Sequence, residues 1–411
     1  PRCVIGQGAF MAATERGDAG RVDYLDGLRG VAALAVLIGH SWLMFSQPIS
    51  SYHVTDGVAA LPAVLLKIIG HVSNSNSAVC IFFLLSGYVM ADFGQGTLLS
   101  FPAQMVRRYI RLAIPILMTS SFAYLLLRFG LFRNAEAGRL FGEWAGQWYQ
   151  FAPSGPSMVY EALVGTFSSG SNAYNPNLWT MHPELLGSFY VLLINAVAAS
   201  RRWRMTLYAC LIAYYLFDYL PLFAVGALLR EYEIEVRQLD RFPGAPITLC
   251  IIGLYLCTFP DATLGPKLQI VYPLPEFNLD NARNWHSIGA TLLLIGVLTS
   301  RAAQRPLASS PAKMLGRISF TLYLIHVPIL CSLGSWLIVA LAPYGYTPAA
   351  AFGLFVTFFT CLVLSTLLSP LVDGSAVSMS RKLGRRVDEL MADDKVPFER
   401  LSSQYPPPVA P

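Results

Sequence analysis

His40 is an ionisable residue in the middle of an apolar stretch. The stretch opens with Asp26-Gly-Leu-Arg29-Gly and then runs without another charge to His40. Twelve residues separate His40 from Leu28, so a helix with a rise of ~1.5 Å per residue carries it about 18 Å into the apolar layer. An ionisable side chain at that depth predicts a functional site. The alternative is a satisfied structural histidine.

A carboxylate that could work with His40 lies in the segment Leu178-Trp179-Thr-Met-His-Pro-Glu184. If this segment enters the membrane from the opposite side, Glu184 and His40 reach a similar depth. A carboxylate beside a histidine fixes its tautomer and stabilises the imidazolium during general-base catalysis. We therefore expect His40 and Glu184 to be catalytic. The alternative for Glu184 is a first-turn carboxylate that faces its own helix N-terminus.

Arginines near the start of two apolar segments could bind phosphate, because the planar guanidinium binds phosphate bidentately. Arg29 and His40 are eleven residues apart, so they share a helix face and lie about 16–17 Å apart along the axis. Arg107, Arg108 and Arg111 form a second cluster. This arrangement suits coenzyme A, which carries phosphates at one end and a thioester at the end of a long arm. The alternative is an ordinary set of charges at the membrane edge.

Tyr323 and His326 lie in a later apolar segment, Ser319-Phe-Thr-Leu-Tyr323-Leu-Ile-His326-Val-Pro328. We expect both of them, together with Trp179, to line the path of the substrate. His326 has a second interpretation as a packed structural residue, and the sequence does not separate the two.

Apolar helices are needed to position these residues, and the composition predicts a membrane protein. Of 411 residues, 55% are hydrophobic and only 13% are charged, whereas a soluble domain carries about 25% charged residues. Roughly 20 mostly apolar residues form one transmembrane helix. We expect an all-α integral membrane protein, a bundle of about ten transmembrane helices. The expected spans are 28–46, 77–93, 109–129, 177–199, 205–217, 219–230, 246–260, 285–300, 315–340 and 348–372.

The basic residues predict the orientation, since cytoplasmic loops are enriched in Lys and Arg. Ten spans with cytoplasmic N- and C-termini place most of the 29 Lys and Arg residues inside. Merging the short pair 205–217 and 219–230 into one span would move two basic clusters outside. The outside loop 130–176 is rich in aromatic residues and is either an interfacial segment or a lid over the site.

The same pattern predicts three regions. They are a cytoplasmic segment 1–24 without a signal peptide, a transmembrane domain 25–375, and a cytoplasmic tail 376–411 that we expect to be disordered.

Several kinds of partner do not fit the sequence. The net charge of +5 comes from short clusters between apolar segments, which argues against nucleic-acid binding. The seven cysteines form no CxxC and no Cys/His spacing that suits zinc, so we expect no metal site and no bound cofactor. The expected partners are the lipid bilayer, an acyl-CoA donor and a hydroxylated acceptor.

Six short motifs together resemble the acyltransferase 3 family of multi-pass membrane O-acyltransferases, and its fungal members in particular. In chain order they are Leu25-Asp26-Gly-Leu-Arg29-Gly with His40, Phe82-Phe-Leu-Leu-Ser86-Gly87-Tyr88, Arg107-Arg108-x-x-Arg111-x-x-x-Pro115, Leu178-Trp179-Thr180-x-x-Glu184, Leu222-Phe-x-x-Gly226, and Ser319-x-x-Leu-Tyr323-Leu-x-His326-x-Pro328. The resemblance implies that His40 is the catalytic base, that Arg29, Arg108 and Arg111 serve acyl-CoA, and that Glu184 has a functional role.

The function that we expect is transfer of a short acyl group, acetyl in the first instance, from acyl-CoA to a hydroxyl of a sugar, a lipid or a small metabolite. A proton-coupled small-solute transporter that uses the same His and Glu is the alternative. The alignment of the arginines with His40, and the absence of an internal repeat, count against it. A third possibility is an inactive family member that acts in binding or signalling.

Overall fold

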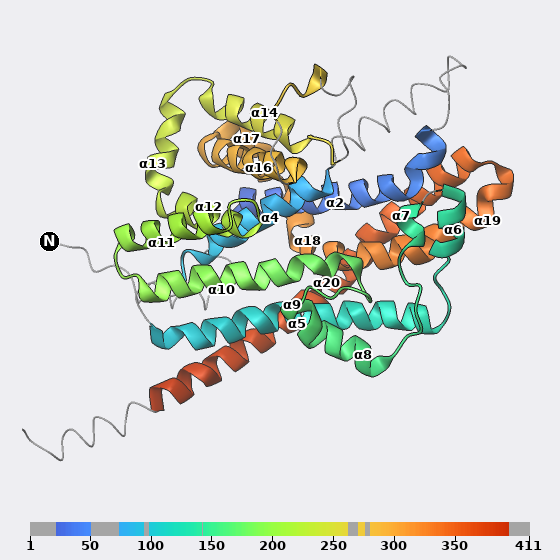
Figure 1. Cartoon of the computed structure of the whole chain (residues 1–411), viewed down its shortest axis with the longest axis horizontal. Coiled ribbons are helices and arrows are strands. Elements are labelled where there is room, and N and C mark those ends of the chain that lie inside the picture. Colours follow the sequence, from blue (N-terminus) through green and yellow to red (C-terminus); the bar gives the residue numbers. More distant parts are fainter. Residues whose placement is uncertain are drawn as a thin grey trace, which may run out of the picture.

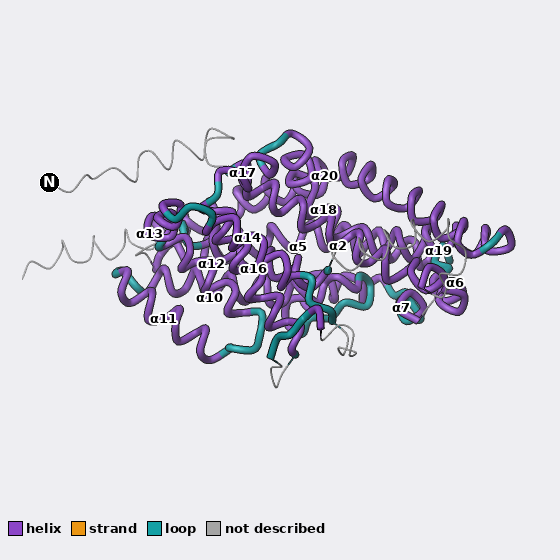
Figure 2. The backbone as a smooth tube through the Cα atoms, turned by 90° about the horizontal axis from the view of Figure 1, so that it is seen from above, coloured by secondary structure: helices purple, strands orange, loops and turns teal. Residues whose placement is uncertain are grey.

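The computed structural model describes residues 22–50, 74–93, 98–141, 143–261, 270–275 and 280–393. These residues contain helices and no strand, as Figures 1 and 2 show. The α-helices are α2 (Asp23–Ser50), α4 (Ser75–Met90), α5 (Phe101–Arg128), α6 (Asn134–Phe141), α7 (Glu143–Gly146), α8 (Gly155–Tyr160), α9 (Thr166–Ser168), α10 (Met181–Val197), α11 (Arg201–Tyr214), α12 (Leu220–Glu231), α13 (Glu233–Arg237), α14 (Ala245–Cys257), α16 (Asn281–Thr299), α17 (Arg301–Leu307), α18 (Ser310–Ile329), α19 (Ser335–Leu341) and α20 (Tyr346–Asp393).

Short 3₁₀ and π segments join several of these helices. The 3₁₀ segments are η1 (Leu98–Ser100), η3 (Pro176–Thr180), η4 (Gln238–Arg241) and η6 (Ala342–Tyr344). The π segments are η2 (Glu161–Gly165) and η5 (Leu330–Gly334).

Four helical stretches among the described residues are long and apolar enough to cross a membrane: Asp23–Met44, Phe101–Arg128, Ser310–Tyr344 and Pro348–Met391. The number rises to six if each of two bent helix pairs counts as one span. All ten predicted apolar segments contain a helix, and the compressed region 205–230 forms two, α11 and α12. The all-α prediction therefore holds for the described residues, whereas ten crossings stay a prediction.

Helices α2 and α18 pack in parallel at the centre of the molecule. Gly30 of α2 meets Gly316 of α18 so closely that a Cβ on Gly30 would lie 2.4 Å from the Gly316 nitrogen. A second pair of glycines, Gly87 and Gly226, brings α4 and α12 equally close. Small residues at such crossings let backbones approach, which is how helices pack where water is absent.

Helix α18 carries a proline whose structural cost is met by a neighbouring segment. Pro328 has no N–H, so the carbonyl of Leu324, four residues earlier, loses its helical partner. Asn175 donates its side-chain amide to that carbonyl at 2.7 Å. Asn177 donates to the carbonyl of Tyr323 at 2.9 Å. These two bonds attach η3 to the middle of α18.

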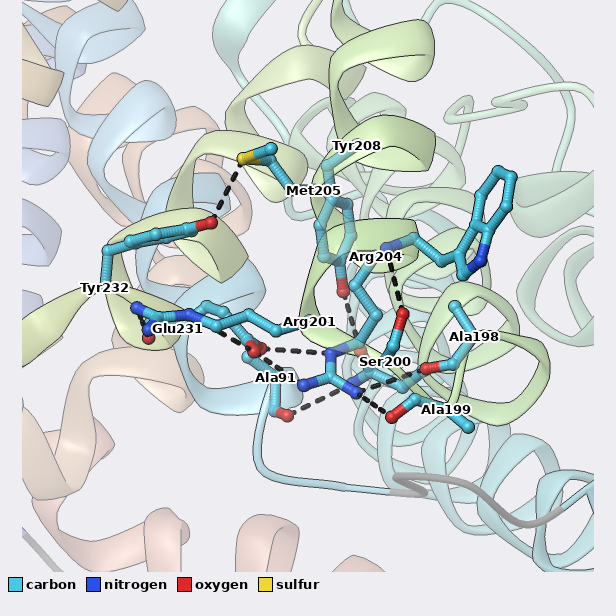
Figure 3. Close-up of polar contacts among 12 residues, drawn as sticks. Ala91, Ala198, Ala199, Ser200, Arg201, Arg204, Met205, Tyr208, Glu231 and Tyr232 are labelled. Carbon is cyan, nitrogen blue, oxygen red and sulfur yellow. Dashed lines mark hydrogen bonds and ion pairs between the residues drawn. The ribbon is translucent and has the colours of Figure 1, made fainter.

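A polar network closes the turn between α10 and α11 (Figure 3). Arg204 donates to both carboxylate oxygens of Glu231, at 3.1 and 2.5 Å, and to the carbonyls of Ala198 and Ala199. Both ionic side chains are 9% exposed. Ser200 caps the start of α11 by accepting from the backbone of Trp203. The network fixes the ends of three helices through bonds that satisfy a buried charge pair.

The last helix is longer than expected. Helix α20 continues to Asp393, so residues 376–393 are helical rather than part of a disordered tail. Arg107 forms an ion pair with Asp388 and crosses Gly384, where a Cβ would lie 2.3 Å from the Arg107 Nε. Docking against α5 therefore supports the polar end of the helix. Residues 394–411 and 1–21 lie outside the described residues, and so do the predictions made for them.

Candidate active site

His40 and His326 meet because α2 and α18 run parallel and in register. The two glycines that touch, Gly30 and Gly316, are 286 residues apart, and so are the two histidines. Each histidine therefore lies ten residues, or about 15 Å, beyond the glycine contact on its own helix. The close crossing positions the two imidazoles to face each other deep within the helix bundle.

The two imidazoles are joined by a hydrogen bond. Nδ1 of His40 lies 2.7 Å from Nε2 of His326, and Nδ1 of His326 lies 3.0 Å from the carbonyl oxygen of Leu322. His326 is fully buried, whereas His40 is partly exposed. The hydrogen bonds of the described residues leave Nε2 of His40 without a partner. His40 thus has one nitrogen held by His326 and one that no described residue holds.

Trp144 of α7 covers one face of His40. Their ring centroids are 5.4 Å apart and their planes are inclined by 25°. Tyr149 follows in the same loop, stacks on Phe132 and is buried. Burial raises the pKa of the Tyr149 hydroxyl above its ordinary value, so the phenol stays neutral. The contact of Trp144 with His40 favours the interpretation of the loop 130–176 as a lid over the site.

Glu184 belongs to a separate, charged cluster. It forms an ion pair with Arg108, and its Oε1 accepts from the hydroxyl of Ser86 at 2.5 Å. Arg108 also donates through Nε to Ser188 at 2.9 Å. The charged side chains are 13% and 11% exposed. Arg108 and Glu184 thereby neutralise each other in a largely closed site.

The hydrogen bonds of the described residues do not join His40 to Glu184. Nδ1 of His40 is bonded to His326, and the carboxylate of Glu184 binds Ser86 and Arg108. Asn177 anchors η3 at the level of Tyr323, about 20 Å from the start of α18. Glu184 lies seven residues further along the chain, in the first turn of α10.

Tyr323 lies between η3 and His326 and is buried. Its hydroxyl lies 2.8 Å from the hydroxyl of Thr180 and 3.0 Å from the carbonyl of Asn177, and the residue is 6% exposed. Its ring centroid is 6.0 Å from that of His326. We interpret Tyr323 as a support for η3 and His326 rather than as a lining residue.

Trp179 packs against Tyr219 rather than against the histidine pair. Its ring lies 5.6 Å from the ring of Tyr219, just before α12, and it has no described ring contact with either histidine. The structure therefore gives Trp179 no place in the histidine pair.

The four arginines that were predicted to bind phosphate differ in their ion pairs and in their exposure. Arg107 and Arg108 are paired with Asp388 and Glu184. Arg29 lies 3.8 Å from Asp26 on its own helix, and Arg111 is exposed. At least three of the four charges are thus engaged with carboxylates of the chain itself.

Sequence reasoning missed the partners that build both clusters. Ser86 and Ser188 bind the Arg108–Glu184 pair, and Asn175 with Asn177 positions α10. A proline inside a membrane helix predicts an unsatisfied carbonyl, so two buried asparagines nearby were the available signal. Nothing in the sequence indicated which aromatic residue of the long loop covers His40.

In the described part of the chain, the fold and the site define an all-helical protein with several long apolar helices and a pair of histidines deep between two of them. Residues 22–366 match the family model of the acyltransferase domain, Acyl_transf_3. The chain belongs to the acyltransferase 3 family. Long apolar helices and this family together indicate a membrane protein.

Three fungal relatives carry names of the same kind. Acyltransferase R4 of Phoma sp. is 25% identical over 393 residues, covering 76% of this chain and 83% of its own. Acyltransferase clz18 of Cochliobolus lunatus is 24% identical, with coverage of 76% and 83%. The O-acetyltransferase PaAT-1 of Phomopsis amygdali is 25% identical, with coverage of 76% and 72%. No solved structure matches. Acyl transfer is the activity that family and relatives support.

Proposed function

We propose that this chain transfers a short acyl group, acetyl in the first instance, from acyl-CoA to a hydroxyl group, with His40 as general base. The observation that carries the proposal is the geometry of His40. It lies deep between two helices and is held through Nδ1, and its other nitrogen has no described partner. A relative named an O-acetyltransferase supports the choice of an acetyl group and an oxygen acceptor.

The proposed reaction uses His40 twice. Nε2 takes the proton of the acceptor hydroxyl as its oxygen attacks the thioester carbonyl and forms the new C–O bond. The tetrahedral intermediate then collapses, the C–S bond breaks, and the thiolate of coenzyme A takes the proton from Nε2. The products are the ester and free coenzyme A, and His40 returns to its neutral form.

The donor is proposed to approach from the cytoplasmic side, where ten spans would place the arginines and both termini. Arg29 and Arg111 are proposed to bind its phosphates, because Arg111 is exposed and the side chain of Arg29 is 33% exposed. Arginine binds phosphate through the planar fork of its guanidinium donors. The acceptor is proposed to be a sugar, a lipid or a small metabolite that reaches His40 beneath Trp144.

The direct test incubates purified protein with acetyl-CoA labelled in the acetyl group and a panel of hydroxylated acceptors. Both the released thiol and the labelled ester are measured. Thiol release that depends on the acceptor and yields labelled ester is expected. Neither product from a folded, purified chain across the panel would contradict the proposal. Movement of an acceptor across vesicles without acylation would support the transporter alternative, against which the family membership argues.

A further inference from the structure

We propose that His326 is a positioning residue that fixes neutral His40 in the tautomer with the proton on Nδ1 and the lone pair on Nε2. The inference rests on the proposed role of His40 as a base. It gives His326 a function other than lining the substrate path, and it follows from the direction of two hydrogen bonds.

The first bond sets the protonation of His326. A carbonyl oxygen can only accept, so Nδ1 of His326 must carry a proton to bond the Leu322 oxygen at 3.0 Å. His326 is fully buried, and its described partners include no carboxylate. A charged imidazolium without an anionic partner is costly in such a place. His326 is therefore neutral, with its lone pair on Nε2.

The second bond passes this preference to His40. Because Nε2 of His326 has only a lone pair, the 2.7 Å contact needs a proton on Nδ1 of His40. A neutral His40 with its proton on Nδ1 has its lone pair on Nε2. This is the nitrogen without a described partner, on the residue that is partly exposed. The hydrogen bond on one ring nitrogen thus decides which nitrogen is basic.

A backbone carbonyl sets the direction of both hydrogen bonds in the histidine pair. The Leu322 carbonyl is part of α18, one turn before His326, and cannot reverse its polarity. The Gly30–Gly316 contact keeps α2 and α18 in register. A carboxylate has this orienting role in a hydrolase triad, and a wrong tautomer there costs about 10⁴ in rate. Here a neutral imidazole has the same role without adding a charge to the interior.

The test compares two replacements of similar size. His326→Leu removes the acceptor. His326→Gln can place its amide oxygen near the position of Nε2. We expect His326→Leu to lower kcat by about 10²-fold or more, and His326→Gln to recover at least about tenfold of that loss. The KM for acetyl-CoA should change by less than about twofold in both. His286→Leu is the matched control, since it removes another fully buried histidine.

A spectroscopic measurement makes the test independent of activity. In protein labelled with ¹⁵N-histidine, ¹⁵N spectra separate protonated from unprotonated ring nitrogens, and His40→Ala assigns the His40 signals. We expect the Nδ1–H form in the wild type and a mixture, or the Nε2–H form, in His326→Leu. An Nε2–H form of His40 in the wild type would overturn the inference. So would a folded His326→Leu variant with wild-type kcat.

The two proposals fail in different ways. If wild-type protein acylates no acceptor and His40 still shows the Nδ1–H form, the proposed function fails and the hydrogen-bond assignment stands. If transfer depends on His40 but not on His326, only the positioning role fails. Equal losses of kcat in His326→Leu and His326→Gln, with an unchanged His40 tautomer in both, would show that His326 contributes only packing.

Discussion

The histidine pair and the network around Arg204 are both buried polar clusters, but their hydrogen bonds end differently. Arg204 directs four hydrogen bonds to Glu231 and to two carbonyls, and both charges are almost completely covered (Figure 3). His40 has one bonded nitrogen and one without a described partner, on a residue that is partly exposed. The first cluster is complete, whereas the second is complete except at one atom.

This difference distinguishes a buried polar cluster that stabilises the fold from one that can take part in a reaction. A buried ion pair whose donors are used holds helix ends together and has little capacity left for a ligand. A histidine that is oriented by a neighbour and open at its other nitrogen is prepared to exchange a proton. The Arg108–Glu184 pair resembles the Arg204 network in this respect, which is why we assign the chemistry to His40 alone.

The largest effect is expected from His40→Ala. Removal of the base should lower acyl transfer by about 10²–10⁴-fold, the contribution typical of general acid–base catalysis. The amount of folded protein should not fall, since His40 is only partly buried. Initial rates of thiol release on purified protein check this, with elution as a single species as the control. A variant with more than a tenth of wild-type activity would remove His40 from the mechanism.

Arg204→Leu should act on stability instead. It leaves Glu231 buried without its partner, which costs about 3–5 kcal/mol. Thermal unfolding in detergent measures the loss, and activity per folded molecule should stay near that of the wild type. Arg237→Ala is the control, because its pair with Glu233 is exposed on the arginine side and contributes at most about 1 kcal/mol. Similar Tm losses in both variants would show that the buried Arg204–Glu231 pair adds no more stability than the exposed one.

Arg111→Gln tests the proposed donor site. We expect the KM for acetyl-CoA to rise several-fold, less so at high salt because the phosphate attraction is partly screened. Arg128→Gln is the matched control, an exposed arginine at the opposite end of α5. Steady-state kinetics at two salt concentrations provide the measurement. An equal rise in KM for both variants would place the phosphates elsewhere.

The smallest effect is expected from Trp144→Leu. The stacked ring contributes about 0.5–1.5 kcal/mol beyond its buried area, so kcat should fall by roughly two- to tenfold. Trp203→Leu, which replaces an exposed tryptophan on α11, is the control. An unchanged kcat in Trp144→Leu would leave the loop as an interfacial segment rather than a lid.

The sequence predicted the helices and the family better than the site. Apolar stretches of helical length mark helices directly, and six weak motifs in a fixed order identified the family that the comparison confirms. The depth of Glu184 could not be predicted, because it depends on two asparagines that anchor η3 halfway along α18. The end of α20 was misjudged because the Arg107–Asp388 contact spans 281 residues of sequence.

The partner of His40 was also within reach but not found. His40 and His326 each follow a glycine by ten residues. Periodicity along one helix does not reveal that two helices share a register, since this depends on which helices become neighbours. Once α2 and α18 pack through Gly30 and Gly316, the meeting of the histidines follows from helix geometry alone.

A small change in the angle between α2 and α18 would be amplified at the histidines. The two backbones touch at Gly30 and Gly316, and the imidazoles lie about 15 Å further along the helices. A change of about 5° in the crossing angle would separate the imidazoles by about 1 Å at that distance. The 2.7 Å hydrogen bond would then exceed its working range. The angle at which two helices cross near one end of the bundle therefore controls the basicity of a single nitrogen near its middle.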